Sequence, residues 1–290
     1  MTDASGAPPT TLDGPDATGR ALFVAVGSAP PTDPTATATV RASEYGRGPW
    51  DPGLLHGGAV CGLAAWAAER VAVADGAALV CARLTVEIQR SVPCDELVVT
   101  AALTKPGRRG RCVAVTIGHQ ERVVARATSQ WLTPSPGLGR GSTSPPLRPN
   151  HAEDPGATDL IDYPRPGFNC DAAELRYVSG SHETPGPGTS WIRLTSPVVA
   201  GTPTSPFVMA ATVADLAAAA AWERGPDDAA YINPDLTLQL NRPPQGEWLC
   251  IEAANHHAEA GVGFNLGSMS DDHGAIGVVL QSLVRSPTDL

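Results

Sequence analysis

Two long segments of this 290-residue chain repeat one pattern, and the repeat limits the possible folds more than any other feature. The run LTVEIQRSVPCDELVV at 84–99 aligns with LTLQLNRPPQGEWLCI at 236–251, a shift of 152 residues. Both runs begin with the alternation of apolar and polar residues that is typical of a half-buried strand. Near the end of each half a further strand-like run carries a glutamine, first Gln130 and then Gln281, at a shift of 151. The nearly constant shift indicates a duplicated unit.

Each half also carries one long Ala-rich segment, at 54–73 and at 205–225, that we predict to be a helix. Both segments are apolar nearly all round, as expected for a buried helix, and Gly225-Pro226 is predicted to end the second. With the strand candidates that precede each helix, each half reads strand-strand-helix-strand-strand-strand. The predicted fold class is α+β: a double hotdog, in which each repeat wraps an antiparallel sheet around one long buried helix whose alanines let the sheet approach closely.

Segments of biased composition divide the chain. Residues 1–19, which are acidic and rich in Pro, are predicted to be a disordered N-terminus. Residues 133–168, which are rich in Pro, Gly, Ser and Thr, are predicted to be a linker. This leaves an N-terminal hotdog at 20–132 and a C-terminal hotdog at 169–290.

Charge and composition argue against several classes of function. With 20 basic and 30 acidic residues, a net charge of −10, the chain lacks the basic surface that binds nucleic acid or anionic membranes. No run of about 20 apolar residues predicts a membrane span, and the first residues do not read as a signal peptide. The six cysteines form no CxxC pair and the seven histidines no metal-ligand spacing. We therefore expect a cytoplasmic protein with reduced thiols, without metal or cofactor.

An ordered set of motifs in the second half resembles the C-terminal half of TesB-type acyl-CoA thioesterases, also called acyl-CoA thioesterase II. In the first half, LLHGGAVCGLAAWA at 54–67 resembles the Gly-Gly helix start of hotdog thioesterases. The motifs of the second half are AELRYV (173–178), SWIRLTS (190–196), ATVADLAAAA (211–220), NPDLTLQLNRPPQGEWL (233–249) and DDHGAIGVVLQSLV (271–284).

The resemblance implies three site residues. In that family an Asp on the second-half helix, a Thr or Ser on the next strand and a Gln on the last strand hold a water against the thioester carbonyl. By motif these positions are Asp215, a polar residue at 233–237, and Gln281. Asn233 stands where the family has its threonine, and Thr237 follows four residues later, so both remain candidates for the middle position. An Asn amide hydrogen-bonds a water as well as a hydroxyl does.

The residues themselves support part of this set. Asp215 is the only acid in the interior of the second predicted helix, and a buried carboxylate needs hydrogen-bond partners and has a perturbed pKa. It suits a general base, or less well a nucleophile. The equivalent position in the first half is Ala65, so we expect one active site per chain. Gln281 lies in an apolar strand, from which its amide would contact the acid and a water; Gln130 has no such acid and is interpreted as structural.

Two further features have alternative interpretations. His56, Gly57 and Gly58 begin the first helix, where backbone N–H groups would bind an oxyanion or phosphate, or where the glycines only allow close packing. His56 itself is a weaker candidate for a base. The turn KPGRRGR carries Arg108, Arg109 and Arg111, which are either solvated or contact the phosphates of CoA.

The function expected first is hydrolysis of an acyl thioester, carried on CoA or on acyl carrier protein, in fatty acid metabolism, with the acyl chain in an apolar tunnel between helix and sheet. An alternative is a hotdog protein that binds acyl thioesters without hydrolysing them, or that has a biosynthetic role. A hydratase or dehydratase is placed last, because that chemistry needs an Asp–His pair at the helix start and we expect no histidine near Asp215. A homo-oligomer is expected, since edge strands of double-hotdog sheets commonly pair between chains.

Overall fold

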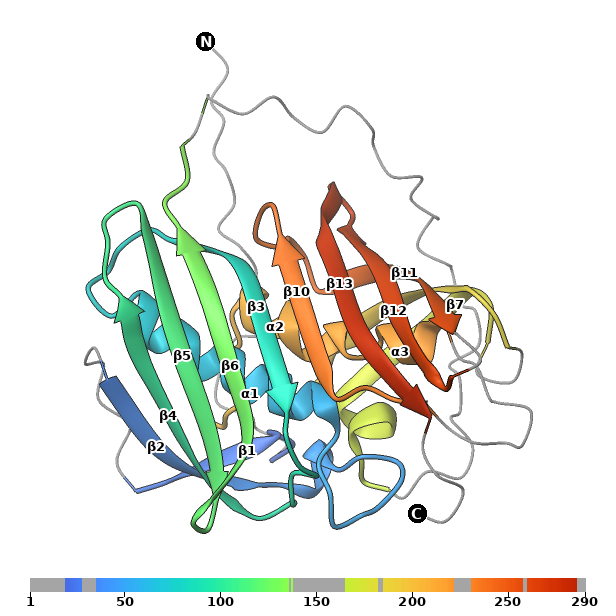
Figure 1. Cartoon of the computed structure of the whole chain (residues 1–290), viewed down its shortest axis with the longest axis horizontal. Coiled ribbons are helices and arrows are strands. Elements are labelled where there is room, and N and C mark those ends of the chain that lie inside the picture. The colour runs from blue at the N-terminus through green and yellow to red at the C-terminus, as the bar shows by residue number, and fades with distance from the viewer. Residues whose placement is uncertain are drawn as a thin grey trace.

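The computed structural model describes residues 19–27, 35–135, 137, 165–181, 185–221, 231–257 and 260–285. Within these residues 13 strands form one antiparallel sheet, with the helices on one of its faces (Figure 1). The strands of the first half are β1 Phe23–Val26, β2 Thr35–Ala42, β3 Val80–Ile88, β4 Glu96–Lys105, β5 Gly110–His119 and β6 Arg122–Leu132. Those of the second half are β7 Ala173–Ser179, β8 Gly188–Leu194, β9 Tyr231–Ile232, β10 Asp235–Leu240, β11 Trp248–His257, β12 Val262–Asp271 and β13 Gly274–Arg285.

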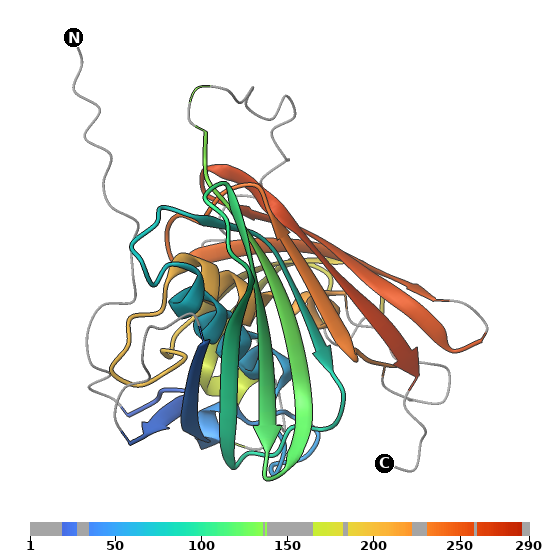
Figure 2. The ribbon, with the colours of Figure 1, turned by 60° about the vertical axis from the view of Figure 1, so that its left-hand side comes forward.

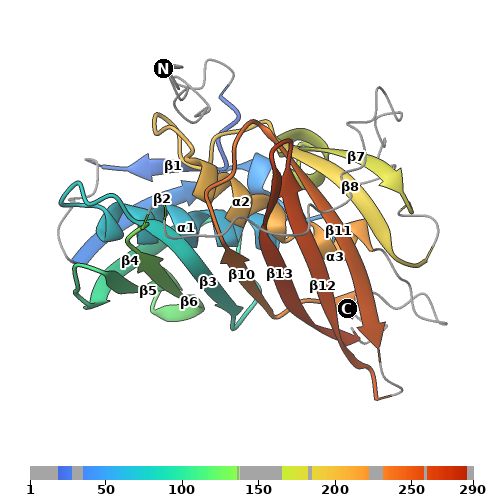
Figure 3. The same ribbon diagram turned by 90° about the horizontal axis from the view of Figure 1, so that it is seen from above.

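The described helical segments lie on the concave side of the sheet, which curves around them (Figures 2 and 3). They are η1 Glu44–Gly46, α1 Gly57–Ala72, η2 Phe168–Ala172, α2 Pro206–Ala214 and α3 Ala217–Ala220. α1 and α2 are buried along nearly their whole length, as their uniform apolar character predicts. This arrangement confirms the predicted α+β double hotdog.

The two halves of the sheet, which correspond to the two sequence repeats, are related by an approximate two-fold axis. Its strand order is β1-β2-β4-β5-β6-β3 followed by β10-β13-β12-β11-β8-β7, so the second half reads as the first half in reverse. β3 and β10 join the halves, and Thr85 pairs with Thr237, its own equivalent at a shift of 152. The two hydroxyls lie 3.2 Å apart. Equivalent residues meet face to face only on the axis itself, so the axis passes between these threonines.

Strand register corrects one detail of the repeat. Thr128 lies opposite Thr85, and Leu280 lies opposite Thr237, so these strands too are related by a shift of 152. The equivalent of Gln281 is therefore Ser129 and not Gln130, as the shift of 151 had suggested. Because side chains alternate across a strand, one residue of slip exchanges the faces of the sheet. Gln281 faces the helices, whereas Gln130 lies on the outer face.

The second helix differs from the single helix predicted at 205–225. It begins after Ser205, whose hydroxyl accepts a hydrogen bond from the N–H of Val208, and α2 ends at Ala214. Two residues, Asp215 and Leu216, separate it from the short α3. The predicted stop at Gly225-Pro226 lies outside the described residues.

The predicted disordered and linker segments also lie largely outside the described residues. At the end of the predicted linker, however, Phe168 begins η2 and is fully buried. Its backbone N–H donates to the carbonyl of Arg47, which ties this segment to the first repeat.

Small residues bring α1 and α2 into close contact. A Cβ added to Gly58 would lie 2.6 Å from the carbonyl oxygen of Thr212, and one added to Gly62 would collide with the Thr212 hydroxyl. That hydroxyl donates to the carbonyl of Val208 in the preceding turn and is fully buried. The two helices can therefore approach only where α1 carries no side chain.

We predict that Gly62→Ala lowers stability. Alanine has the higher helix propensity by about 1 kcal/mol, but its methyl group would force α2 away at Thr212, at a cost of about 1–3 kcal/mol. Denaturant unfolding measures the balance. Gly118→Ala in β5 is the control, because its Cβ would meet nothing nearer than 3.5 Å. A higher unfolding midpoint for Gly62→Ala would show that propensity dominates and that the helices are not in tight contact here.

Candidate active site

Asp215 occupies the break between α2 and α3, opposite the start of α1. Its side chain is only 4% exposed. Asn233, in the turn before β10, donates from Nδ2 to Asp215 Oδ1 at 2.6 Å. Gln281 of β13 donates from Nε2 to the same oxygen at 3.0 Å and to the backbone carbonyl of Asp215 at 3.3 Å. Two neutral amides thus hold one carboxylate oxygen and leave the other facing α1.

Of the two candidates for the middle position, Asn233 contacts the acid and Thr237 does not. Thr237 instead shares its hydroxyl hydrogen bond with Thr85 on the two-fold axis. Asn233 reaches the acid because Ile232 and Tyr231 form β9, which pairs with the end of β13 and draws the turn toward Gln281.

His56 approaches the free side of the carboxylate. Its Nδ1 lies 3.1 Å from Asp215 Oδ2, and the same nitrogen lies 2.9 Å from the backbone N of Gly58. When Nδ1 carries a proton it donates to Asp215; when it does not, it accepts from Gly58. The ring stacks on Phe168 at 4.4 Å between centroids. The expectation that no histidine lies near Asp215 was wrong, because 159 residues of sequence separate two side chains that the helix pairing brings together.

Gly57 allows the acid to reach the helix start. A Cβ on this residue would lie 2.6 Å from Asp215 Oδ2, so a larger residue would displace the carboxylate. Of the two interpretations of Gly57-Gly58, the structure shows the close packing, here against the Asp215 carboxylate at the positive end of α1. Binding of a substrate oxyanion or phosphate at this helix start stays a prediction.

These contacts keep the acid ionised. Burial alone raises the pKa of Asp215, but His56, Asn233 and the backbone N–H of Gly58 together outweigh it and hold the pKa below the ordinary aspartate value. A buried, charged carboxylate is therefore present at neutral pH and able to accept a proton.

Gln281 has one unused hydrogen-bonding atom. Its side chain is fully buried, and Oε1 has no hydrogen-bond partner among the described residues. Since Nε2 is taken by Asp215, the amide can still accept a hydrogen bond next to the acid. Water is a donor of suitable size for this position.

A row of amides continues from Gln281 across the inner face of the sheet. Asn265 of β12 lies directly opposite Gln281, and Asn255 of β11 lies opposite Asn265. Asn265 donates to the carbonyl of Ala217, and Asn255 to that of Ala221. Tyr177 of β7 donates to the carbonyl of Ala219.

With Gln281, four sheet side chains thus donate to the alternate carbonyls 215, 217, 219 and 221. These bonds tie the broken helix to the sheet, and the carbonyl of Ala217 also accepts from the N–H of Ala221 within α3. Asn255 and Asn265 were not among the site residues predicted from the sequence. The repeat could have revealed them, because their equivalents in the first half, at a shift of 152, are the apolar residues Leu103 and Val113. A polar residue of one repeat that replaces an apolar residue of the other is a candidate for a role specific to that repeat.

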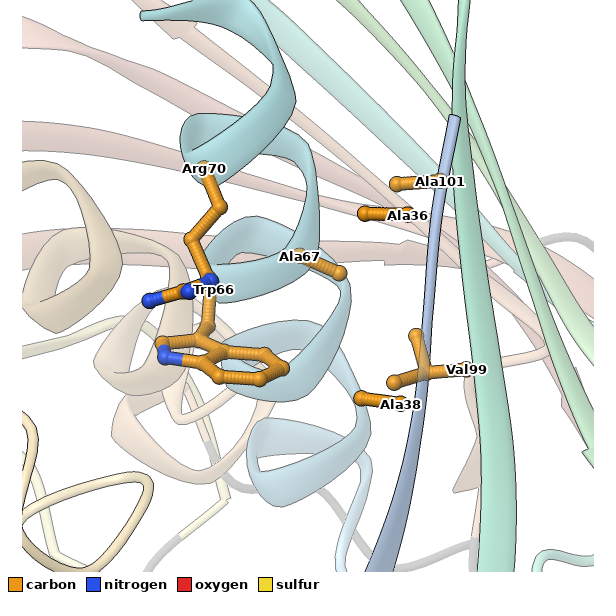
Figure 4. A pocket seen from close by; sticks show the side chains of 7 residues that line it. All are labelled: Ala36, Ala38, Trp66, Ala67, Arg70, Val99 and Ala101. Carbon is orange, nitrogen blue, oxygen red and sulfur yellow. The ribbon is translucent and has the colours of Figure 1, made fainter. Parts of the chain in front are cut away.

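The equivalent site of the first repeat is filled. Counted from the two helix N-caps, Asp215 corresponds to Trp66, one residue from the predicted Ala65, and Gly58 corresponds to Phe207. Both aromatic side chains are buried. Beside Trp66, between α1 and the strands β2 and β4, the pocket shown in Figure 4 has a volume of about 10 Å³, close to that of one water. It does not provide the predicted acyl tunnel on this side of α1.

The predicted phosphate-binding arginines lie at the far end of α1 from Asp215, about 24 Å away along the 16-residue helix. Arg111 donates to the carbonyl of Ala72 and pairs with Asp75 at 2.6 Å, so it caps the helix. These contacts favour the structural alternative for Arg111, and a contact with the CoA phosphates stays a prediction. Arg108 lines an open pocket of about 510 Å³ at that end, and Arg109 is exposed on the same hairpin.

The described part of the chain contains no cluster of three His, Cys, Asp or Glu side chains that could hold a metal ion. Among the same residues, no helix combines the length and the apolar character needed to cross a membrane.

Comparisons with solved structures agree with the fold. The tesB protein of Mycobacterium avium subsp. paratuberculosis is 16% identical, with 87% of this chain and 93% of that chain covered and a TM-score of 0.63. An acyl-CoA thioesterase II of Mycobacterium marinum is 17% identical, with the same coverage and a TM-score of 0.61. A hot dog protein of unknown function from Alicyclobacillus acidocaldarius is 15% identical, covers 91% and 96%, and has a TM-score of 0.68. No curated protein matches the sequence.

Family models match both halves of the sequence in order. The acyl-CoA thioesterase N-terminal domain matches residues 46–131, and the acyl-CoA thioesterase C-terminal domain matches residues 143–284. The resemblance seen in the motifs is thereby confirmed over most of the chain. The chain belongs to the acyl-CoA thioesterase family and is a thioesterase with a double-hotdog fold.

Proposed function

We propose that the chain hydrolyses an acyl-CoA to a free acid and CoA, with Asp215 as the general base. The observation that carries the proposal is the buried carboxylate held between Asn233, Gln281 and His56 at the start of α1. The acyl-CoA substrate is taken from the matched family. An ionised base, an adjacent unused acceptor on Gln281 and a positive helix end meet there, and hydrolysis of a thioester uses all three.

In the proposed reaction a water donates one hydrogen bond to Asp215 and the other to Gln281 Oε1. Asp215 takes the water proton as the oxygen bonds to the thioester carbon, and the carbonyl electrons move to oxygen. The N-terminal end of α1 stabilises the negative charge that forms there. Collapse of the intermediate breaks the carbon–sulfur bond, and the proton on Asp215 passes to the thiolate. The products are the acid and CoA with a free thiol.

The contact between His56 and Asp215 favours a second candidate, hydration of an enoyl thioester, since an Asp–His pair suits that chemistry. The two activities separate in one assay. Incubation with crotonyl-CoA gives free thiol if the thioester is hydrolysed, and loss of the conjugated absorbance without thiol if the double bond is hydrated. Binding without either change would indicate a non-hydrolytic role.

We predict that Asp215→Asn reduces thiol release from acyl-CoA about 10²–10⁴-fold, because the amide cannot accept the water proton. Gln281→Ala should lower the rate less, by removing one contact to the water. Gln130→Ala is its matched control: a strand glutamine on the outer face, which should leave the rate unchanged. Full activity of Asp215→Asn with an intact fold would contradict the mechanism.

The pH dependence should depend on His56. The base works when deprotonated, and the low pKa of Asp215 keeps it so in mildly acidic solution. His56→Ala removes the strongest contact that opposes burial, so the pKa of Asp215 should rise. The acid limb of kcat/KM, measured from about pH 4 to pH 8 by chromatography of quenched reactions, should then move to higher pH. A uniform loss of rate with an unmoved limb would show that His56 does not set this pKa.

Asn265→Val, which installs the equivalent residue of the first repeat, should lower kcat about tenfold or more with little change in KM. Without the donor to Ala217 the broken helix shifts, and small displacements of a base are costly to the rate. Ser268→Ala, on the outer face of the same strand, is the control. Unchanged kcat in Asn265→Val would show that the amide row has no part in placing Asp215.

A further inference from the structure

A pocket of about 510 Å³ lies between the C-terminal end of α1 and the hairpin that joins β4 to β5. We call it the hairpin pocket. Val71 and Ala74 line it from the helix side, and Leu103 and Pro106 line it from the hairpin side. Small-molecule sites in proteins typically have volumes of about 300–1,000 Å³ and largely apolar walls. The hairpin pocket thus has the size and the lining of a ligand site, about 24 Å along α1 from Asp215.

The hairpin that borders this pocket is strongly basic. Residues 105–111, KPGRRGR, contain four of the 20 basic residues of the chain and no acidic residue, although the whole chain has a net charge of −10. At a shift of 152 the second repeat has HAEAGVG at 257–263, with one acidic residue and neither lysine nor arginine. The fold therefore does not require basic residues at this turn, and their concentration in the first repeat favours an anionic ligand.

One acidic residue, Asp75, lines the pocket, and Arg111 neutralises it. The two side chains form a bidentate pair with contacts of 2.8 and 2.6 Å, which lowers the pKa of Asp75 to about 2. Arg111 also donates to the carbonyls of Ala72 and Gly107, and so joins the helix to the hairpin. The guanidinium of Arg111 is therefore occupied in the wall of the pocket.

Arg108 provides the cation that stays available in the pocket. Its backbone carbonyl accepts a hydrogen bond from the hydroxyl of Thr133 at 2.7 Å, which fixes the hairpin to the end of β6. Its guanidinium has no hydrogen bond or ion pair with any residue that the structure describes. Arg109 lies next to it but does not line the pocket. Since a guanidinium binds a carboxylate through two parallel hydrogen bonds, Arg108 can hold one anionic group beside an apolar space.

We propose that the hairpin pocket binds an aliphatic carboxylate, with the head group on Arg108 and the hydrocarbon chain against Val71 and Leu103. One available guanidinium matches one anionic head group, and the apolar walls match a hydrocarbon tail. Leu103 stands where the second repeat has Asn255, whose amide donates to the carbonyl of Ala221. At this position the first repeat instead presents an apolar side chain to a pocket.

Isothermal titration calorimetry of the full chain with octanoate tests the proposal without any measurement of hydrolysis. Octanoate should bind, and octanol, which has the same chain without the charge, should bind at least about tenfold more weakly. Butyrate should also bind at least about tenfold more weakly, because each buried methylene improves the dissociation constant about fourfold. A wild-type chain that does not bind octanoate would overturn the proposal and leave the account of Asp215 untouched.

Variants separate the hairpin pocket from any acyl site near Asp215. Arg108→Gln should weaken octanoate binding at least about tenfold. Arg109→Gln removes the same charge from the same hairpin and should change the dissociation constant by less than about twofold, because this residue does not line the pocket. Leu103→Asn, which installs the second-repeat residue, should also weaken binding. Circular dichroism establishes that each variant folds, and the exposed Arg108→Gln decides the matter if Leu103→Asn does not.

Two results would contradict the proposal. Equal octanoate binding by Arg108→Gln and Arg109→Gln would place the carboxylate elsewhere on the chain. CoA alone is the last titrant: binding of CoA that depends on Arg108, together with octanoate binding that does not, would make the hairpin a phosphate site.

Discussion

A buried charge is the constraint on which the site depends. A carboxylate inside an apolar helix pair is stable only if hydrogen-bond donors surround it, and Asp215 receives them from three directions: Asn233, Gln281 and the start of α1 with His56. These hydrogen bonds require particular features in other parts of the chain. The helix start must carry Gly57 to make room, and the second helix must break at the acid so that its carbonyls face the sheet.

The duplication allows the two repeats to contribute different residues to one site. Two identical repeats would place the same set of residues at both ends of the helix pair, but here each repeat carries a different subset. The second contributes the acid and the amide row, and the first contributes the glycine-rich helix start. At the other end Trp66 and Phe207 fill the space, and Glu69, three residues after Trp66, accepts a hydrogen bond from Ser205 at the N-cap of α2. These substitutions support the expectation of one active site per chain.

The fold was predictable because periodicity and repetition are local properties of sequence. The buried helix at 54–73 and the paired runs at 84–99 and 236–251 lie where their patterns indicated. The break in the helix at Asp215 was not predictable from helix propensity. The hydrogen-bond donors that bind its carbonyl groups lie on strands up to 66 residues away in the sequence. The contact with His56 was missed for the same reason. The amide row could have been found by comparing the two repeats at the shift of 152. The shift of 151 inferred from Gln130 gave the wrong register for the last strands, and the comparison was not made.

The central claim, that Asp215 activates water rather than attacking the thioester itself, is tested most directly by a single turnover in ¹⁸O-labelled water with enzyme in excess. General-base catalysis predicts one ¹⁸O atom in the released acid and none in the peptide that contains Asp215. A nucleophilic carboxylate would form a mixed anhydride with the acyl group, and attack of water on its Asp215 carbonyl would transfer the Asp215 oxygen to the product and leave ¹⁸O in Asp215. An unlabelled acid together with ¹⁸O in the Asp215 peptide would contradict the account.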